Sequence, residues 1–386
     1  MRSMVLVLYL VLVQCWSTSW SQSVDPVQDL AHRWSDFGIR LFRSAASHSD
    51  QNLLLSPSGA GLSLSSVLER SAGSGREQLE RALGLQGLQA TDLVSRLRAA
   101  MAGGSLGGVA WFVAQGAEPD DAYRKNLEES FGADLRTVDF SSVQDSVDSI
   151  QRWVLEQTQD RVQIPSTGLD LGPDPQLVLA SGLHIQARFS VPFNASQTLQ
   201  ERFFVDRYHT VMVSMMLTSG RFLLAYDRDL KTGVLRLGLD QGAAMLVLVP
   251  DEGVHVNTLE DELSAEKVQI WIQALKKTRL EVQLPRFALE QATPLKLNLK
   301  KLGVTQVFAD NSLSQVRPSK TSLDPHRVLD SATLSVDETS VPGGVASSFK
   351  IPAPRLTVNR PFVFVVYHEA TRTLQMIGRV VDPTQK

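Results

Sequence analysis

The segment that decides the fold lies near the C-terminus, where residues 361–381 read PFVFVVYHEATRTLQMIGRVV. Two apolar and β-branched runs flank the short stretch Glu369-Ala370-Thr371-Arg372, a pattern typical of a β-hairpin. Short apolar runs bounded by Gly, Pro and Asp also occur at residues 177–180 and 243–249, and we expect strands there. The second half of the chain is therefore expected to be rich in sheet.

The first half shows helical periodicity instead. Apolar residues recur at three- and four-residue steps over residues 26–47, 75–100 and 143–160, and one more helical stretch is expected at about 259–277. Helices concentrated early and strands late predict the α+β class. Because we find neither an internal repeat nor a dividing linker, we expect a single domain.

Composition excludes several classes of protein. The chain of 386 residues has 38 Lys and Arg against 41 Asp and Glu, so its net charge is −3 and no nucleic-acid partner is expected. One Cys excludes a disulfide framework, and the seven His lack metal-binding spacing, so we expect neither a metal nor a cofactor. A GxSxG match at residues 103–107 lies in a glycine-rich stretch and not between a strand and a helix, so we expect no enzyme.

The N-terminus predicts export. Arg2 precedes an unbroken apolar run at residues 4–13, which is shorter than the ~20 residues that span a bilayer. Ser19 and Ser21 occupy the −3 and −1 positions of a cleavage site, so residues 1–21 are expected to be a signal peptide. We expect a secreted, extracellular protein that is not held in a membrane, with residues 22–386 as its mature domain.

A glycosylation signal accompanies this leader. The sequon Asn194-Ala195-Ser196 is an acceptor for N-linked glycan if it is exposed, and we expect Asn194 to be modified in a secreted chain.

One segment resembles neither core nor an ordinary turn. Residues 338–358 read ETSVPGGVASSFKIPAPRLTV, with three prolines and few periodic apolar residues. A loop of this length inside a compact domain is uncommon and is usually functional or disordered.

Eight short runs in order along the chain are similar to those of the serpin family. They are NLLLSP at 52–57, FGA at 131–133, FFVD at 203–206, LPRF at 284–287, LKKLGV at 299–304, SVDE at 335–338, NRPFVF at 359–364 and IGRVVDP at 377–383. The resemblance covers about residues 28–383 and is strongest to secreted, plasma-type members. It implies about nine helices, three β-sheets, a monomer, and an exposed reactive-centre loop at about 338–358.

Inhibitory members of that family trap a serine protease with this loop. After acylation the loop inserts as a new central strand of the main sheet, which releases a strained fold. The hinge after Glu338 then needs small residues with free N–H groups. Here Ser340 stands where Gly is expected, Val341 where Thr is usual, and Pro342 cannot donate to a sheet ladder.

The length of the loop also departs from the inhibitory pattern. Counting from Glu338 by the family spacing places the cleaved bond after Pro354, whereas counting back from Asn359 places it after Lys350. The loop is therefore about four residues short, so less strand could be inserted.

A third departure concerns the cluster of polar residues where the main sheet opens. The resemblance places this sheet-opening cluster at Ser56, Gly59, Ser181 and Asp330, of which only Ser56 keeps the family residue. The Trp found in relatives where the loop first enters corresponds to Phe189.

Two small basic clusters are candidates for binding glycosaminoglycan, although a solvated helix face is the commoner explanation. Lys276, Lys277 and Arg279 lie near an expected helix end, and Lys296, Lys300 and Lys301 form the other cluster.

Two classes of function remain open. The first is a serpin that no longer inhibits and acts as a binding, carrier or signalling protein for a receptor or ligand; the hinge favours this class. The second is a suicide inhibitor of an extracellular trypsin-like serine protease, cleaved at Lys350–Ile351 or Arg355–Leu356, because a basic side chain suits an acidic specificity pocket.

Overall fold

The computed structural model describes residues 25–101, 107–164, 169, 171, 175–309, 325–340 and 353–386. The expected signal peptide at residues 1–21 lies outside these ranges. The helices are α2 (Pro26–Ala46), α3 (Pro57–Leu68), α4 (Gly73–Leu83), α5 (Ala90–Ala100), α6 (Asp121–Asn126), α7 (Val143–Thr158), α8 (Val256–Glu262), α9 (Ala265–Ala274) and α10 (Lys296–Lys301). The described residues thus contain the nine α-helices expected.

The strands form two hydrogen-bonded sheets. The five-stranded sheet has the order β10 (Phe287–Pro294), β11 (Pro325–Ser340), β4 (Leu177–Phe189), β2 (Gly108–Ala114) and β3 (Ala133–Val138). The nine-stranded sheet has the order β1 (Leu53–Leu55), β14 (Leu374–Val380), β13 (Phe362–His368), β8 (Ala243–Pro250), β7 (Thr232–Gly238), β6 (Thr210–Asp227), β9 (Lys276–Pro285) and β12 (Arg355–Thr357), with β5 (Leu199–Phe204) also paired to β6.

The long strand β6 explains why two of the three expected sheets are continuous. Its first part pairs with β5 and its last part with β7, while β9 runs alongside most of its length. This 18-residue strand therefore joins two of the three expected sheets into the single nine-stranded sheet.

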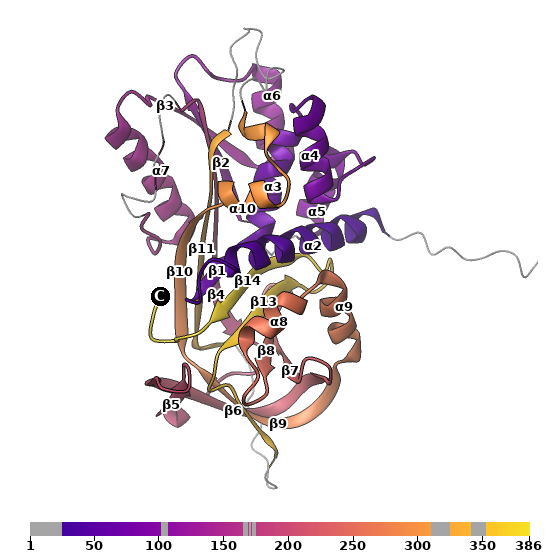
Figure 1. The fold of residues 1–386 in the computed structure, drawn as a ribbon, viewed down its shortest axis with the longest axis vertical. Coiled ribbons are helices and arrows are strands. Elements are labelled where there is room, and N and C mark those ends of the chain that lie inside the picture. Colours follow the sequence, from indigo (N-terminus) through magenta and orange to yellow (C-terminus); the bar gives the residue numbers. More distant parts are fainter. Residues whose placement is uncertain are drawn as a thin grey trace, which may run out of the picture.

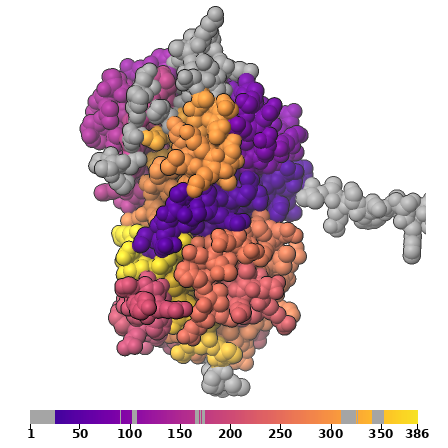
Figure 2. All heavy atoms as spheres, viewed as in Figure 1, coloured from indigo at the N-terminus to yellow at the C-terminus, as the bar shows by residue number. Residues whose placement is uncertain are grey.

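Helix α2 crosses the middle of the molecule (Figure 1). The five-stranded sheet runs past α2, with its upper part between α7 on one side and α3 to α5 on the other, and the nine-stranded sheet lies below α2. On the surface, α2 is an indigo band between these two halves (Figure 2). One apolar cluster surrounds α2 and α3, and a second fills the space between the lower parts of the two sheets.

The expected C-terminal hairpin is confirmed. Strands β13 and β14 pair antiparallel from Phe362↔Val380 onward, and every residue of both strands is buried. Burial on both faces explains why these runs are almost continuously apolar and do not alternate.

Two helical predictions were too long. The stretch 75–100 is two helices, because Gly84 adopts a left-handed conformation with φ of 69° at the end of α4. The stretch 259–277 is divided between α8 and α9, and its last residues, from Lys276, already belong to strand β9.

The buried ion pair between Arg379 and Glu260 gives a test of the fold. The Arg379 side chain is 1% exposed and donates to both Glu260 carboxylate oxygens, at 2.9 and 3.0 Å, and to the Gln51 carbonyl. Arg379→Met would leave that carboxylate buried without its cation. We expect the free energy of unfolding in urea to fall by about 3–5 kcal/mol.

The control is Lys125→Met, which removes a pair whose side chains are 72% and 67% exposed. It is expected to change stability by less than about 0.5 kcal/mol. A loss below about 1 kcal/mol in Arg379→Met would contradict the structural role of this pair.

Candidate functional site

The candidate site is the seam where strands β4 and β11 pair in the five-stranded sheet. The two strands are parallel and adjacent, from Pro325↔Leu177 to Ser340↔Phe189. No other strand lies between them, so the main sheet is closed. Any segment that entered the sheet here would first have to separate this pair.

The four residues of the predicted sheet-opening cluster lie together on the inner face of the seam. Asp330 lies opposite Ser181 in the strand register, and the Ser181 hydroxyl donates to its Oδ1 at 2.7 Å. The backbone N–H of Ser56 donates to Oδ2 at 2.7 Å. Ser56 also caps α3, because its hydroxyl accepts from the N–H of Gly59. One carboxyl therefore ties both strands of the seam to the start of α3.

Gly59 fits this cluster for a steric reason. A Cβ placed there would lie 2.9 Å from the Ser181 Cβ and 3.0 Å from the Ser56 Oγ. The glycine therefore lets Ser181 approach the helix closely. The three departures from the family pattern, at Gly59, Ser181 and Asp330, form one packed unit.

Burial of Asp330 changes its ionisation. Removal from water raises the pKa of this carboxyl from 3.8 to about 7, although the hydrogen bonds from Ser56 and Ser181 lower it in part. The cluster is therefore sensitive to pH in the neutral range.

A second row of side-chain hydrogen bonds crosses the seam on its outer face. His184 Nδ1 lies 2.5 Å from Thr333 Oγ1, and Gln186 donates to Asp337 at 3.1 Å. Arg161, which follows α7, donates to Ser335 at 2.8 Å. Sequence reasoning missed this row. Its only signal is that polar residues alternate along both strands, which does not say which of them face each other.

The hinge is anchored where β11 ends. Glu338 accepts two hydrogen bonds from Arg286 Nη2, at 2.7 and 2.8 Å, and one from the Thr198 hydroxyl. Burial raises the pKa of Glu338, but the bonds from Arg286 and Thr198 outweigh it and leave that pKa below its usual value. Ser340 still belongs to β11, whereas Val341 and Pro342 lie outside the described residues.

The ladder is irregular just before the hinge. Between the pairs Val336↔Ala187 and Ser340↔Phe189, β11 advances four residues while β4 advances two. Phe189 is buried and packs edge-to-face on Phe193, with ring centroids 5.0 Å apart. It lies eight residues beyond Ser181 along β4, so it is not in contact with the sheet-opening cluster.

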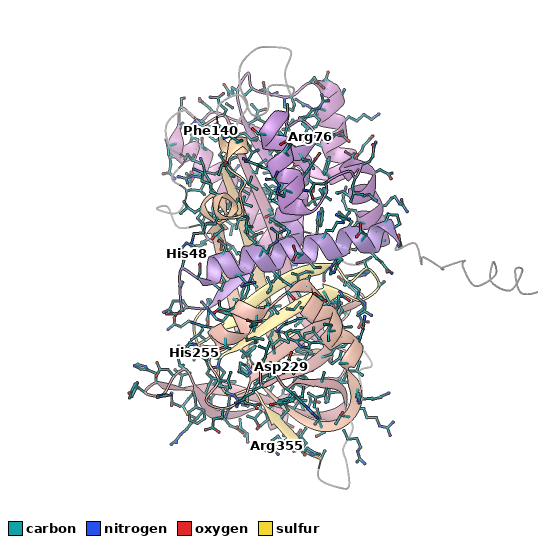
Figure 3. All side chains as sticks on the ribbon, turned by 45° about the vertical axis from the view of Figure 1, so that its right-hand side comes forward. His48, Arg76, Phe140, Asp229, His255 and Arg355 are labelled. Atoms are coloured by element: carbon teal, nitrogen blue, oxygen red, sulfur yellow. The ribbon has the colours of Figure 1, made fainter. Side chains whose placement is uncertain are left out.

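The other end of the predicted loop is also a strand. Arg355 and Leu356 belong to β12, which pairs parallel with β9, and Arg355 forms an ion pair with Glu281 at 2.8 Å. Figure 3 places Arg355 at the lower end of the molecule. This pairing disfavours Arg355–Leu356 as the presented bond. The other candidate, Lys350–Ile351, lies outside the described residues.

The remaining candidates are on the surface. Lys276, Lys277 and Arg279 follow directly after the end of α9 at Ala274, as expected, and they belong to the first half of strand β9, so they lie on a strand and not on a helix face. Arg279 lies directly opposite Arg221 of β6. Asn194 is exposed, and its Oδ1 accepts a hydrogen bond from the Ser196 hydroxyl at 2.8 Å.

Comparison with known proteins decides the family. The model for "Serpin (serine protease inhibitor)" matches residues 32–383. The chain belongs to the serpin family. Protein Z-dependent protease inhibitor of Mus musculus is 28% identical over 374 residues, covering 92% of this chain and 83% of that protein. The Homo sapiens protein of the same name is also 28% identical, with the same coverage.

Solved serpin structures agree with this fold. Mouse protein Z-dependent protease inhibitor superposes with a TM-score of 0.82 at 26% identity, covering 92% of this chain and 98% of that chain. Human thyroxine-binding globulin in complex with its hormone superposes with a TM-score of 0.84 at 21% identity, covering 93% and 100%. Serpins with different roles therefore share this architecture.

The described part of the chain contains no group of three or more His, Cys, Asp or Glu side chains placed to hold a metal ion. No helix within the same ranges is both long and apolar enough to cross a bilayer.

Asp330 gives a prediction with a defined sign. Because its folded pKa of about 7 exceeds the unfolded value of 3.8, the folded protein binds this proton more tightly. The resulting stability is fully present below pH 3.8 and is lost as the pH rises to about 7. This difference between the two pKa values corresponds to as much as about 4 kcal/mol in the free energy of unfolding. Asp330→Asn should remove this loss.

The measurement is the melting temperature of wild type and of Asp330→Asn between pH 4 and pH 8, and the difference between the two proteins is compared at each pH. The difference is needed because burial lowers the pKa values of His184 and His368, which makes stability rise with pH. Asp92→Asn, at a carboxylate 72% exposed, serves as the control and should follow wild type. Parallel profiles for wild type and Asp330→Asn would contradict the role assigned to Asp330.

Proposed function

We propose that this protein is a secreted serpin that has lost protease inhibition and acts by binding, as a carrier or as a signalling ligand. The observation that carries the proposal is that side chains, in addition to the backbone ladder, hold the seam between β4 and β11 together. Side-chain hydrogen bonds cross it on both faces, at Ser181–Asp330 inside and His184–Thr333 outside. Inhibition in this family requires the loop to part these strands.

The hinge supports the same conclusion. Glu338, from which insertion would start, is held by Arg286 and Thr198. The next residues to enter would be Val341 and Pro342. Proline has no N–H for a sheet ladder and is essentially excluded from central strands. Pro342 would therefore oppose the first step of insertion, in which these residues enter the sheet.

The alternative is a suicide inhibitor of a trypsin-like protease with Lys350 before the cleaved bond. It is favoured by the likeness to relatives that are named as protease inhibitors. It is also favoured by the strands that flank residues 341–352, because β11 belongs to the five-stranded sheet and β12 to the nine-stranded sheet.

We further propose that the protein is exported after removal of residues 1–21, that Asn194 carries glycan, and that the chain is a monomer. The exposed position of Asn194 supports modification. Lys276, Lys277 and Arg279 are proposed as a secondary glycosaminoglycan contact, since Arg221 adds a fourth cation beside them. A relative of this fold, protease nexin-1, has been solved with heparin.

The direct test is incubation of the mature protein with trypsin and trypsin-like plasma proteases, followed by a denaturing gel. An inhibitory serpin treated in parallel provides the positive control. We expect cleaved protein and free enzyme without a covalent complex, because the loop cannot translocate the acylated protease. A stable complex at high yield would overturn the proposal in favour of the inhibitor.

Limited trypsin digestion should show which basic residue is accessible. We expect the first cut after Lys350. Arg355 is less accessible to the protease, because its side chain forms an ion pair with Glu281 and its strand, β12, pairs with β9. Lys350→Gln should abolish this cut, and Arg355→Gln should leave it unchanged. Intact mass of the C-terminal fragment identifies the bond, and a first cut after Arg355 would contradict the strand assignment in solution.

Cleavage should change stability little. An inhibitory serpin gains a full central strand when its cleaved loop inserts, whereas Pro342 and the closed seam oppose insertion here. We expect the clipped protein to melt within a few degrees of the intact one in differential scanning calorimetry. An increase of ~20 °C would correspond to several kcal/mol for a chain of this size and would show that insertion still operates.

A further inference from the structure

A cavity of about 370 Å³ lies beside the seam, on the side of β4 away from β11. Strand β2 begins at Gly108, opposite Gly182 of β4. The next bridge that β4 forms on this side is the one between Phe189 and Leu239. The cavity occupies the interval between these two points. Its volume falls within the range of small-molecule sites, roughly 300–1,000 Å³.

The lining carries a net positive charge. Arg161 and Arg188 contribute two guanidinium groups, and Asp240 contributes one carboxylate, 3.8 Å from Arg188. His184 also lines the cavity, and burial together with the charge of Arg161 lowers its pKa, so it is neutral near pH 7. One cationic charge therefore remains without a carboxylate in the lining.

Arg161 is the better placed of the two cations. It donates one hydrogen bond to Ser335, and no carboxylate in the described ranges forms an ion pair with it. A guanidinium has five N–H donors in a planar fork that suits carboxylate and sulfate oxygens. Arg188 is more exposed and already lies near Asp240.

The backbone around the cavity is strained. Five non-glycine residues in the described chain have positive φ, and three of them, Gln159, Asp160 and Gln241, line or adjoin this cavity. Gln159 and Asp160, with φ of 53° and 60°, turn the chain at the end of α7 and bring Arg161 to the sheet. Such conformations cost free energy and cluster at functional sites.

The remaining lining combines an apolar wall with side-chain amides. Ile185, Leu239 and Ala243 contribute the apolar part, while Gln159, Gln186 and Gln241 supply amide groups. A wholly inorganic anion would leave the apolar wall uncovered. A neutral apolar molecule would leave the Arg161 guanidinium without an anionic partner.

We propose that this cavity binds a small amphiphilic organic anion, with its carboxylate, sulfate or sulfonate group at Arg161 and its apolar body against Ile185 and Leu239. The site is separate from the loop and does not depend on whether the protein inhibits proteases. It is coupled to the seam, because Arg161, His184 and Gln186 also bond to β11. A ligand here binds the closed sheet and stabilises it.

The test uses 8-anilinonaphthalene-1-sulfonate, an apolar body with one sulfonate, titrated into the folded mature protein and followed by fluorescence. Two further probes separate its parts: the neutral dye N-phenyl-1-naphthylamine, and inorganic sulfate as a competitor. We expect one saturable site for the sulfonate dye, at least about tenfold weaker binding of the neutral dye, and weak competition by sulfate.

Arg161→Met should weaken binding of the sulfonate dye about tenfold. Arg152→Met, at an exposed arginine of α7 that does not line the cavity, is the matched control and should bind as wild type does. Near-UV circular dichroism checks that both variants are folded. Equal affinity for the neutral dye, or unchanged affinity of the sulfonate dye in Arg161→Met, would overturn the proposal, and the first of these needs only the wild-type protein.

Discussion

The structure depends on one constraint, which is that the parallel strands β4 and β11 remain neighbours. Their separation would break a backbone ladder that extends from Leu177 to Phe189. It would also expose to water hydrogen bonds that are buried in the closed sheet, such as the one between Ser181 and Asp330. A buried donor or acceptor left unsatisfied costs about 1–3 kcal/mol, so a few of these bonds decide whether the sheet opens.

The inner and outer faces of the seam contribute differently. On the inner face, Gly59 allows Ser181 to approach, and Ser181 with Ser56 satisfies the carboxyl of Asp330. These residues are in mutual contact, so a change at one of them alters the effect of a change at another. In the outer row, Thr333 and Ser335 are buried whereas their partners His184 and Arg161 are partly exposed. The bonds of this row help to fix the register of the seam.

Much of the fold could be predicted from sequence, because its signals are local. The hairpin at residues 361–381 and the helices at 26–47 and 143–160 each follow from the spacing of apolar residues. The sheet-opening cluster required the family resemblance, since Ser56 and Asp330 are distant in sequence. The partners of Arg161 and Arg355 could not be predicted, because they depend on the register between strands and on a turn at Gln159 that no pattern marks.

Strand β9 and the residue after it hold both ends of the predicted loop. Arg286 binds Glu338 at the hinge, and Glu281 binds Arg355 in β12. The arginine of each pair is about half exposed, and exposed ion pairs contribute only about 0–1 kcal/mol. These pairs therefore position the ends of the loop without providing the main resistance to insertion. In the proposed non-inhibitory serpin, the resistance therefore comes from the buried bonds of the seam and from Pro342, which act at the same early step. Under that proposal, removing either ion pair would leave insertion blocked, and only changes in the seam and the hinge together would restore it.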